Sequence, residues 1–228
     1  MSDTDFTPNE MMTIAASRAL KNTDVCFVGI GAPSAACNIA RLTHAPDVTL
    51  FRYWLQGGRV TVGFLGAAQI DRFGNINTTV IGDYDEPKTR LPGGGGAPEI
   101  ASSSGEIFIT LKQSRRAMVD KIDFYTSFGH GDGGDHRERL GITTKGPTLM
   151  VTDLAVWKPD PVTREFTVVS LHPGVTREMV QAECGWTVRF AEAVEETPAP
   201  TEIELKTLRD LNARTKAAHA GGKSGEAA

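Results

Sequence analysis

The stretch DVCFVGIGAPSAACNIARLTHAPDVTLF, residues 24–51, contains two short apolar runs separated by an amphipathic segment. Each apolar run has the length and unbroken hydrophobicity of a strand that is buried on both faces of a parallel sheet. The segment between them, Ala32 to Pro46, predicts a helix with Pro33 in its first turn, a position that tolerates proline. The stretch therefore predicts a strand–helix–strand unit. Its glycine turn, Gly29 to Gly31, falls at the strand end where open α/β sheets bind ligands.

Similar patterns elsewhere in the chain extend this unit into an α/β fold. We expect an open, mostly parallel sheet with helices on both faces, in a single domain of residues 1–220 with an antiparallel addition. That addition is a hairpin formed by residues 147–160 and 164–174. Residues 221–228 are expected to form a disordered tail. Further strands are predicted at residues 59–71, 74–82 and 106–112, and helices at residues 9–20, 176–185 and 200–220.

The composition narrows the possible partners and the compartment. The chain has 228 residues, a formal net charge of −4 and 40% hydrophobic residues. No strongly basic face or membrane-spanning run is implied, so we expect neither nucleic acid nor a membrane as a partner. The N-terminal MSDTDFTPNE lacks the features of a signal peptide. The cysteines, Cys26, Cys37 and Cys184, are widely spaced, which predicts reduced thiols in a cytoplasmic protein, with Cys26 in the core.

Several familiar site patterns are incomplete in this sequence. Gly29-Ile30-Gly31 lacks the third glycine of a dinucleotide fingerprint, so we reject a NAD site. No serine lies in a G-x-S-x-G turn, so hydrolysis by an activated serine has no support. His172, before Pro173-Gly174, favours a tight turn at a strand end. One loop gathers histidines and aspartates at spacings that match no known metal cage: His130, Asp132, Asp135 and His136. For that loop we favour structural histidines over a metal site.

Three turns at the ends of predicted strands are rich in glycine or polar residues. They are GIGAPS at residues 29–34, GAAQIDRFGNIN at residues 66–77 and GGGGAPE at residues 93–99. Taken alone, the glycine run favours a flexible surface loop, because a lone glycine pattern is a weak signal. Several such turns at one edge of a sheet, however, make a cleft lined with backbone N–H groups, as in an oxyanion hole or a thioester pocket.

The same three turns resemble the motifs of a known family. GIGAPS resembles the turn G-I-G-[LI]-P, and residues 66–77 resemble G-A-x-Q-[VI]-[DS]-x-x-G-[ND]. The chain is similar, over nearly all its length, to the B subunits of class I coenzyme A transferases, which include the 3-oxoacid, 3-oxoadipate and glutaconate transferases. YWLQGGR, TVIGDY and SLHPGVTRE resemble the 3-oxoadipate branch. The glycine run resembles G-x-G-G-A-x-[DE], with these residues on the motif positions: Gly93, Gly95, Gly96, Ala97 and Glu99.

This resemblance implies a covalent, ping-pong reaction in which a glutamate of the B subunit carries CoA from succinyl-CoA to 3-oxoadipate. It implies an A subunit as partner, in a heterotetramer, with acyl-CoA and dicarboxylic acids as substrates. CoA is itself a substrate, so no cofactor and no metal is expected. The glycine run would then line the active site. The residues that the resemblance assigns to the oxyanion and CoA sites are Gly95, Gly96, Ala97, Gly29, Gly31, Gln69 and Asn75.

The chain departs from the family at the nucleophile. The family's glutamate stands in an E-[SN]-G turn after the second strand, and no such tripeptide occurs in this chain. Here the second strand runs directly into RYWLQGG, although strand-to-helix connections normally need about 2–6 residues. We therefore expect a few dozen residues to be missing between Leu50 and Phe51, and no catalytic residue in the chain itself. Of two explanations, a genuine deletion and a sequence joined across absent residues, we favour the second.

Three other functions stay open. The chain could serve another transferase of the family, such as a glutaconate CoA-transferase. A paralogue without its glutamate could be a CoA-thioester hydrolase or ring-opening lyase that uses an acid of its partner, or a non-catalytic scaffold subunit. Isotope exchange separates these functions: a transferase moves CoA between two acids, a hydrolase releases CoA into water, and a scaffold does neither.

Overall fold

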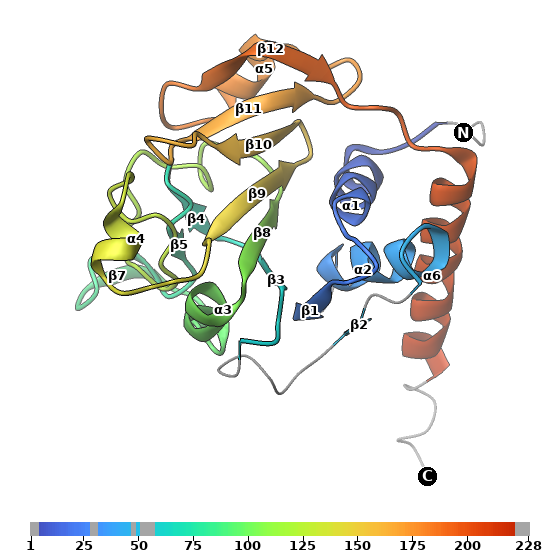
Figure 1. Ribbon diagram of the computed structural model, residues 1–228, viewed down its shortest axis with the longest axis horizontal. Helices are drawn as coiled ribbons and strands as arrows, with labels where there is room; N and C mark the ends of the chain where they lie inside the picture. Colours follow the sequence, from blue (N-terminus) through green and yellow to red (C-terminus); the bar gives the residue numbers. More distant parts are fainter. Residues whose placement is uncertain (1–4, 28–31, 47–48, 51–57, 222–228) are drawn as a thin grey trace.

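The computed structural model describes residues 5–27, 32–46, 49–50 and 58–221, and its centre is an eight-stranded sheet (Figure 1). The strand order is β12-β11-β10-β9-β8-β3-β1-β2. Strands β2, β1, β3, β8 and β9 pair in parallel, β10 is antiparallel to both of its neighbours, and β12 is parallel to β11. The predicted open, mostly parallel sheet is confirmed. The strands are β1 (Val25–Phe27), β2 (Thr49–Leu50), β3 (Val62–Leu65), β8 (Glu106–Leu111), β9 (Pro147–Thr152), β10 (Ala155–Pro159), β11 (Phe166–Leu171) and β12 (Arg189–Glu196).

The strand–helix–strand unit at the start of the chain forms as predicted. β1 and β2 are parallel, with Cys26 opposite Leu50, and α2 (Ala32–Thr43) connects them. Cys26 is buried, which confirms its expected place in the core. The glycine turn, Gly29 to Gly31, and the junction of Leu50 with Phe51 lie outside the described residues. The expectations for both therefore stay predictions.

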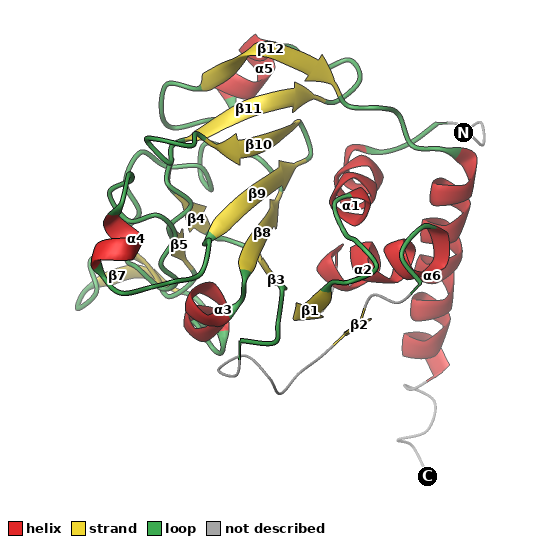
Figure 2. Ribbon diagram, viewed as in Figure 1, coloured by secondary structure: helices red, strands yellow, loops and turns green. Residues whose placement is uncertain are grey.

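Helices α1 (Pro8–Arg18) and α2 cover one face of the sheet (Figure 2). α1 begins with a capping box. The Thr7 hydroxyl accepts the Glu10 N–H at 3.2 Å, and the Glu10 carboxylate accepts the Thr7 N–H at 2.8 Å. Two of the four N–H groups that a helix start leaves without partners are thereby satisfied. Below these helices lies a core of buried side chains that includes Met12, Ala16, Cys26, Cys37, Ala40, Phe64, Phe108 and Leu149.

Helix α6 (Glu202–Gly221) forms an outer layer over α1 and α2. An ion pair with Nε of Arg18 2.6 Å from Oε1 of Glu204 joins α1 to α6. The predicted amphipathic helix is confirmed, although Gly221, expected in the tail, belongs to it; residues 222–228 lie outside the described residues. The apolar contact between the layers is made by Ile14, Ile39, Leu205 and Leu208. None of the helices in the described residues is long and apolar enough to cross a membrane.

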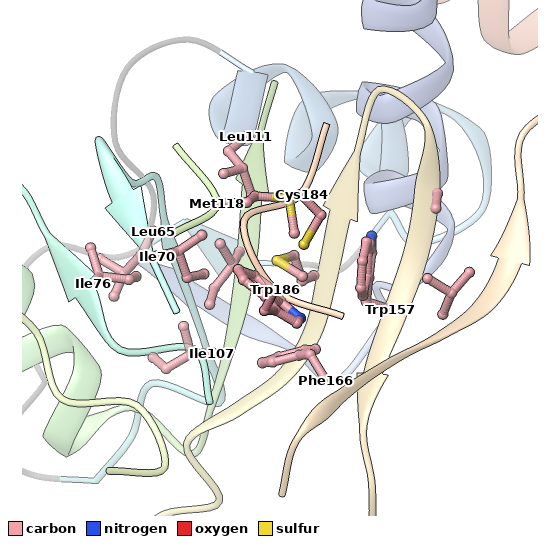
Figure 3. Close-up of a cluster of buried hydrophobic side chains, with 14 of the residues drawn as sticks. Leu65, Ile70, Ile76, Ile107, Leu111, Met118, Trp157, Phe166, Cys184 and Trp186 are labelled. Carbon is pink, nitrogen blue, oxygen red and sulfur yellow. The ribbon is translucent and has the colours of Figure 1, made fainter. Parts of the chain in front are cut away.

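The opposite face of the sheet is covered by α3 (Ala97–Ser103), α5 (Arg177–Ala182) and a small sheet of β4 (Gln69–Ile70) and β5 (Ile76–Asn77). Helices therefore lie on both faces, as predicted. Thr176 caps α5 by accepting the N–H of Met179. Figure 3 shows the core on this side, where bulky side chains of the sheet meet those of the covering segments. It includes Ile107, Met118, Trp157, Phe166, Cys184 and Trp186.

Two predicted strands are wrong in extent. Residues 59–71 form β3 and then β4, and residues 74–82 form β5 and then β6 (Val80–Gly82), which pairs with β7 (Pro87–Arg90). The break after β5 has a local cause. The side-chain oxygen of Asn77 accepts the N–H groups of Thr79 and Val80, at 2.9 and 3.3 Å, which turns the chain as asparagine commonly does. The apolar pattern continues across such a turn and does not reveal it.

The predicted hairpin is confirmed as β10 and β11, but its first arm was predicted too long. Residues 147–160 form two antiparallel strands, β9 and β10, instead of one. The Thr152 hydroxyl accepts the N–H groups of Leu154 and Ala155, at 3.2 and 3.0 Å, and so begins the turn between them. Helix α3 and strand β7 have no counterpart in the sequence analysis. A further short helix, α4 (His136–Arg139), lies in the loop after β8.

Candidate active site

A cavity of about 510 Å³ opens at the carboxyl ends of β3 and β8. The chain runs from β1 outward to β2 and returns to β3 on the other side of β1. The cavity thus lies beside a topological switch point, where open α/β sheets bind ligands. Its volume is within the range of about 300–1,000 Å³ that is usual for small-ligand sites. Apolar residues make up much of its wall, among them Met12, Pro33, Phe64, Leu65, Ile100 and Leu111.

The glycine run reaches this cavity. Gly93 and Gly94 line it, together with Ala97, the first residue of α3. In the described part of the chain, the N–H groups of Gly94–Gly96 donate no hydrogen bond to the protein, so they are free to face a ligand. Gly93 and Gly94 are therefore part of the site, whereas Gly95 and Gly96 do not line the cavity. The oxyanion role predicted for Gly95 and Gly96 is not tested by this geometry and stays a prediction.

Gln69 and Asn75 are buried and do not line the cavity. The Gln69 amide donates to the Asp123 carboxylate at 2.9 Å and accepts from the Asn77 amide at 2.7 Å. The Asn75 amide donates to the carbonyl oxygen of Gly131 at 2.8 Å and accepts the Gly131 N–H at 3.0 Å. These bonds stabilise the loops beside the cavity. The CoA-binding role predicted for both residues is untested, but their polar groups are already used within the fold.

Thr78 connects this polar network to the glycine run. Its hydroxyl donates to the Gly93 carbonyl oxygen at 3.1 Å, and its own carbonyl oxygen accepts the Gly93 N–H at 2.9 Å. The Thr78 N–H donates in turn to the Thr126 hydroxyl at 2.9 Å. Because Thr78 directly follows Asn77, the second motif of the sequence positions the third. Sequence analysis missed this role, which requires knowledge of which loops are neighbours.

The described groups with a shifted pKa all lie away from the cavity walls. Burial raises the pKa of Asp71, although hydrogen bonds from Asn75 oppose the shift. Burial lowers the pKa of His130 to about 4, and its Nε2 lies 2.7 Å from the carbonyl oxygen of Pro147. A neutral His130 that donates to this carbonyl fits the structural role favoured for the loop histidines. His172 similarly bonds the Thr152 carbonyl oxygen, which holds a strand end.

Besides Thr78, three further polar residues that line the cavity were not found by sequence analysis. They are Asn9 at the start of α1, Thr110 near the end of β8, and Lys112 directly after it. Among the described residues that line the cavity, Lys112 alone has a charged side chain, and none has a carboxylate. The position of Thr110 and Lys112 at the end of a buried strand was the available signal. Within the described ranges, no three side chains form a group that could hold a metal ion.

Comparison with known proteins assigns the chain to a family. The family model described as "Coenzyme A transferase" matches residues 48–183, a stretch that contains β3, β8 and the glycine run of the cavity. The chain belongs to the coenzyme A transferase family. The fold of this transferase chain agrees with the assignment, because the crystal structure of the glutaconate coenzyme A-transferase from Acidaminococcus fermentans superposes with a TM-score of 0.83. That superposition covers 91% of this chain and 95% of the other, at 30% sequence identity.

Curated relatives define which part of a transferase the chain is. It is 56% identical to the B subunit of the 3-oxoadipate CoA-transferase of Pseudomonas knackmussii, over 97% of this chain and 98% of the relative. It is 32% identical to the B subunit of the glutaconate CoA-transferase of Acidaminococcus fermentans, over 89% of this chain and 91% of the relative. The transferase chain is therefore a B subunit of a two-subunit enzyme. A more distant relative, 25% identical over 77% of this chain and 82% of its own length, is a cholesterol ring-cleaving hydrolase IpdB subunit of Mycobacterium tuberculosis.

The alignment lengths bear on the expected missing segment. The alignment with the Pseudomonas relative extends over 257 positions, more than the 228 residues of this chain. The relative therefore contains residues that have no counterpart here. This agrees with the expectation that residues are missing from the transferase chain. Their place, predicted between Leu50 and Phe51, stays a prediction.

Proposed function

We propose that this B subunit, when it contains the residues predicted to be missing between Leu50 and Phe51, acts together with its A subunit to move CoA from succinyl-CoA to 3-oxoadipate. The observation that supports this choice is the 56% identity to one chain of a 3-oxoadipate CoA-transferase over almost the whole of both chains. The cavity at the sheet edge supports it as well, because its apolar walls suit an acyl chain and its glycine run offers free N–H groups. CoA is a substrate in this proposal, and no further cofactor is part of it.

The proposed reaction exchanges acyl groups on the glutamate predicted in the segment between Leu50 and Phe51. A carboxylate oxygen attacks the thioester carbon of succinyl-CoA, the C–S bond breaks, and CoA thiolate leaves a mixed anhydride. The thiolate attacks the glutamyl carbonyl carbon, which releases succinate and forms a glutamyl-CoA thioester. The carboxylate of 3-oxoadipate repeats the steps in reverse, so each new bond replaces a broken one and no net proton transfer is needed. Water must be excluded because it would hydrolyse both intermediates.

The glycine run is expected to stabilise the oxyanions of this reaction, and Gly96→Val tests that role. Gly96 has an ordinary φ of −85°, and a Cβ there would meet no atom within 4 Å, so the variant should fold. Valine keeps the backbone N–H, but its side chain would occupy the space where the thioester oxygen must lie. Because one oxyanion donor contributes about 100-fold to turnover, we expect kcat of the complex that contains the predicted glutamate segment to fall by about that factor. Turnover is measured by chromatography of the CoA esters.

The same substitution at Gly95 is expected to slow turnover as well, but its φ of 48° adds backbone strain. Gly141→Val is a matched control for that strain, since Gly141 has a φ of 72° and open space around it, far along the chain from the glycine run. Folding of each variant is checked by circular dichroism. If Gly96→Val folds and keeps wild-type turnover, the glycine run is only a loop.

The transferase chain alone is expected to move no CoA between succinyl-CoA and 3-oxoadipate. Its relatives are named as single subunits of CoA-transferases, and the cavity is open at the sheet edge where a partner could complete it. The assay uses the chain extended by the residues predicted between Leu50 and Phe51, and compares it alone and in complex with the A subunit. The mass of the complex, expected to be that of a heterotetramer, is determined by light scattering. Full turnover without a partner would contradict the expectation.

A hydrolase is the second candidate function. None of the described residues that line the cavity has a carboxylate, and a relative of the chain is named as a ring-cleaving hydrolase subunit. An acid of the A subunit would then direct water to a CoA-bound substrate. The complex of the extended chain, which contains the residues predicted between Leu50 and Phe51, is given succinyl-CoA and labelled 3-oxoadipate, and free CoA is measured with a thiol reagent. Release of CoA without labelled CoA ester favours the hydrolase, and labelled ester favours the transferase.

A further inference from the structure

We propose that Lys112, with the hydroxyl of Thr110 and the amide of Asn9, binds the free carboxylate of the acyl substrate, the one that does not react. The inference rests on the proposed function and deepens it, because it assigns to named residues the choice of dicarboxylic over monocarboxylic acids. Three observations carry it: the position of the three residues at one cavity, the lack of partners for their polar groups, and the apolar wall around them.

Thr110 lies on β8, and Lys112 follows directly after the strand ends at Leu111. Side chains alternate along a strand, so residues 108 and 110 share one face of β8. Phe108 packs in the core below α1 and α2, whereas Ile107 and Ile109 belong to the core of the opposite face. Thr110 therefore lies on the α1 side of the strand, and Lys112 and Asn9 of α1 line the same cavity at the sheet edge.

The polar groups of these residues are not used by the fold. Thr110 is only 8% exposed, yet its hydroxyl makes no hydrogen bond within the described part of the chain. The Asn9 amide and the Lys112 ammonium likewise have no hydrogen-bond or ion-pair partner among the described residues. The Thr110 hydroxyl is not among the enclosed polar atoms without a partner, so it reaches the cavity and is available to donate to a ligand there. A carboxylate accepts from all three donors at once.

The apolar surroundings make these three donors necessary for binding a carboxylate in the cavity. The described wall of the cavity is otherwise mostly apolar, and Lys112 alone is charged there. Asn9 and Lys112 are exposed, so a carboxylate that enters the cavity loses part of its hydration, which is unfavourable unless a cation and hydrogen-bond donors replace the lost water. A site built in this way also rejects the analogue that lacks the charged group, because its own donors would then stay unpaired.

The chemistry of the proposed reaction needs one such subsite. Succinyl-CoA has a thioester at one end and a free carboxylate at the other. 3-Oxoadipate reacts through one carboxylate and keeps the second. Because donor and acceptor occupy the site in turn in a ping-pong reaction, one cation can orient both substrates. The lysine therefore acts as a specificity-determining residue and takes no part in the bond changes.

Binding, and not turnover, gives the sharpest test, since it does not depend on the glutamate. The complex of the 228-residue chain with its A subunit is titrated calorimetrically with succinyl-CoA and with butyryl-CoA, which have the same acyl chain length and differ in the free carboxylate. We expect Lys112→Met to weaken succinyl-CoA binding by about 10- to 100-fold and to change butyryl-CoA binding less than about two-fold. Thr110→Val should weaken succinyl-CoA binding in the same selective way.

Two matched variants complete the experiment. Lys121→Met removes another exposed lysine outside the cavity wall and should bind both thioesters like the wild type. Lys112→Arg keeps the charge and should retain most of the preference for succinyl-CoA. Equal weakening of both thioesters by Lys112→Met, or no weakening of either, overturns the inference while the proposed function stands. A wild-type complex that binds neither thioester overturns the proposed function and this inference together.

Discussion

Inserting the missing residues between Leu50 and Phe51 is expected to raise the rate of CoA transfer by about a thousand-fold or more over that of the 228-residue chain in complex with its A subunit. These are the residues that the Pseudomonas relative contains and this chain lacks. The insertion is expected to carry a glutamate followed by Ser-Gly or Asn-Gly. β2 ends at Leu50 and lies in the parallel part of the sheet with β1 and β3, so a turn after it lies at the same sheet edge as the cavity. Without the insertion no carboxylate is available there, because none of the described lining residues has one.

The control for this experiment is the same insertion with its glutamate changed to glutamine. After incubation with succinyl-CoA, hydroxylamine should trap an enzyme thioester only in the version that has the glutamate, and mass spectrometry locates the modified residue. The complex of the 228-residue chain should show neither transfer nor trapping. If that complex transfers CoA as fast as the extended one, the glutamyl nucleophile is wrong. If the insertion restores nothing, the hydrolase or the scaffold function is favoured instead.

The sequence predicted those parts of the fold whose pattern is set by burial alone. β1 is a short apolar run that lies inside the sheet between β2 and β3, with Cys26 buried, and the leucines of α6 recur in one stripe because that stripe packs on Ile14 and Ile39. The strand at 59–71 was predicted too long because nothing in the apolar pattern marks where β3 leaves the sheet. Strands end where side chains such as that of Asn77 hydrogen-bond to the backbone, and such bonds depend on the fold around them.

The candidate site was predicted in part, for a similar reason. The glycine run is visible in the sequence because the need for glycine is local, as the φ of 94° at Gly93 shows. The motif positions of Gln69 and Asn75 do not distinguish a residue that touches a ligand from one that supports a loop. Asn9 and Lys112 are far apart in sequence, and only the packing of α1 against the sheet brings them to one cavity.

Arg137 shows how the loops around the site are held together. Its side chain is only 5% exposed, and no carboxylate pairs with it in the described residues. The guanidinium instead donates to backbone carbonyl oxygens of three separate segments. Burial lowers the pKa of Arg137 to about 10, which still leaves it charged at neutral pH. The acceptors belong to Ala101 in α3, Phe128 and Gly129 in the loop that bonds Asn75, and Thr144.

Replacing Arg137 by methionine is expected to lower the free energy of unfolding by at least about 3 kcal/mol, because several buried carbonyl oxygens lose their donor together and each such loss costs about 1–3 kcal/mol. Urea unfolding of the purified chain, followed by the fluorescence of the buried Trp157 and Trp186, measures the change. Arg139→Met on the same short helix is the matched control. Arg139 is 61% exposed and pairs with Asp135 at the surface, so its loss should cost less than about 1 kcal/mol. Similar unfolding curves for the two variants would show that Arg137 does not hold these loops. Water or another donor would then hydrogen-bond the carbonyl oxygens with little loss of stability.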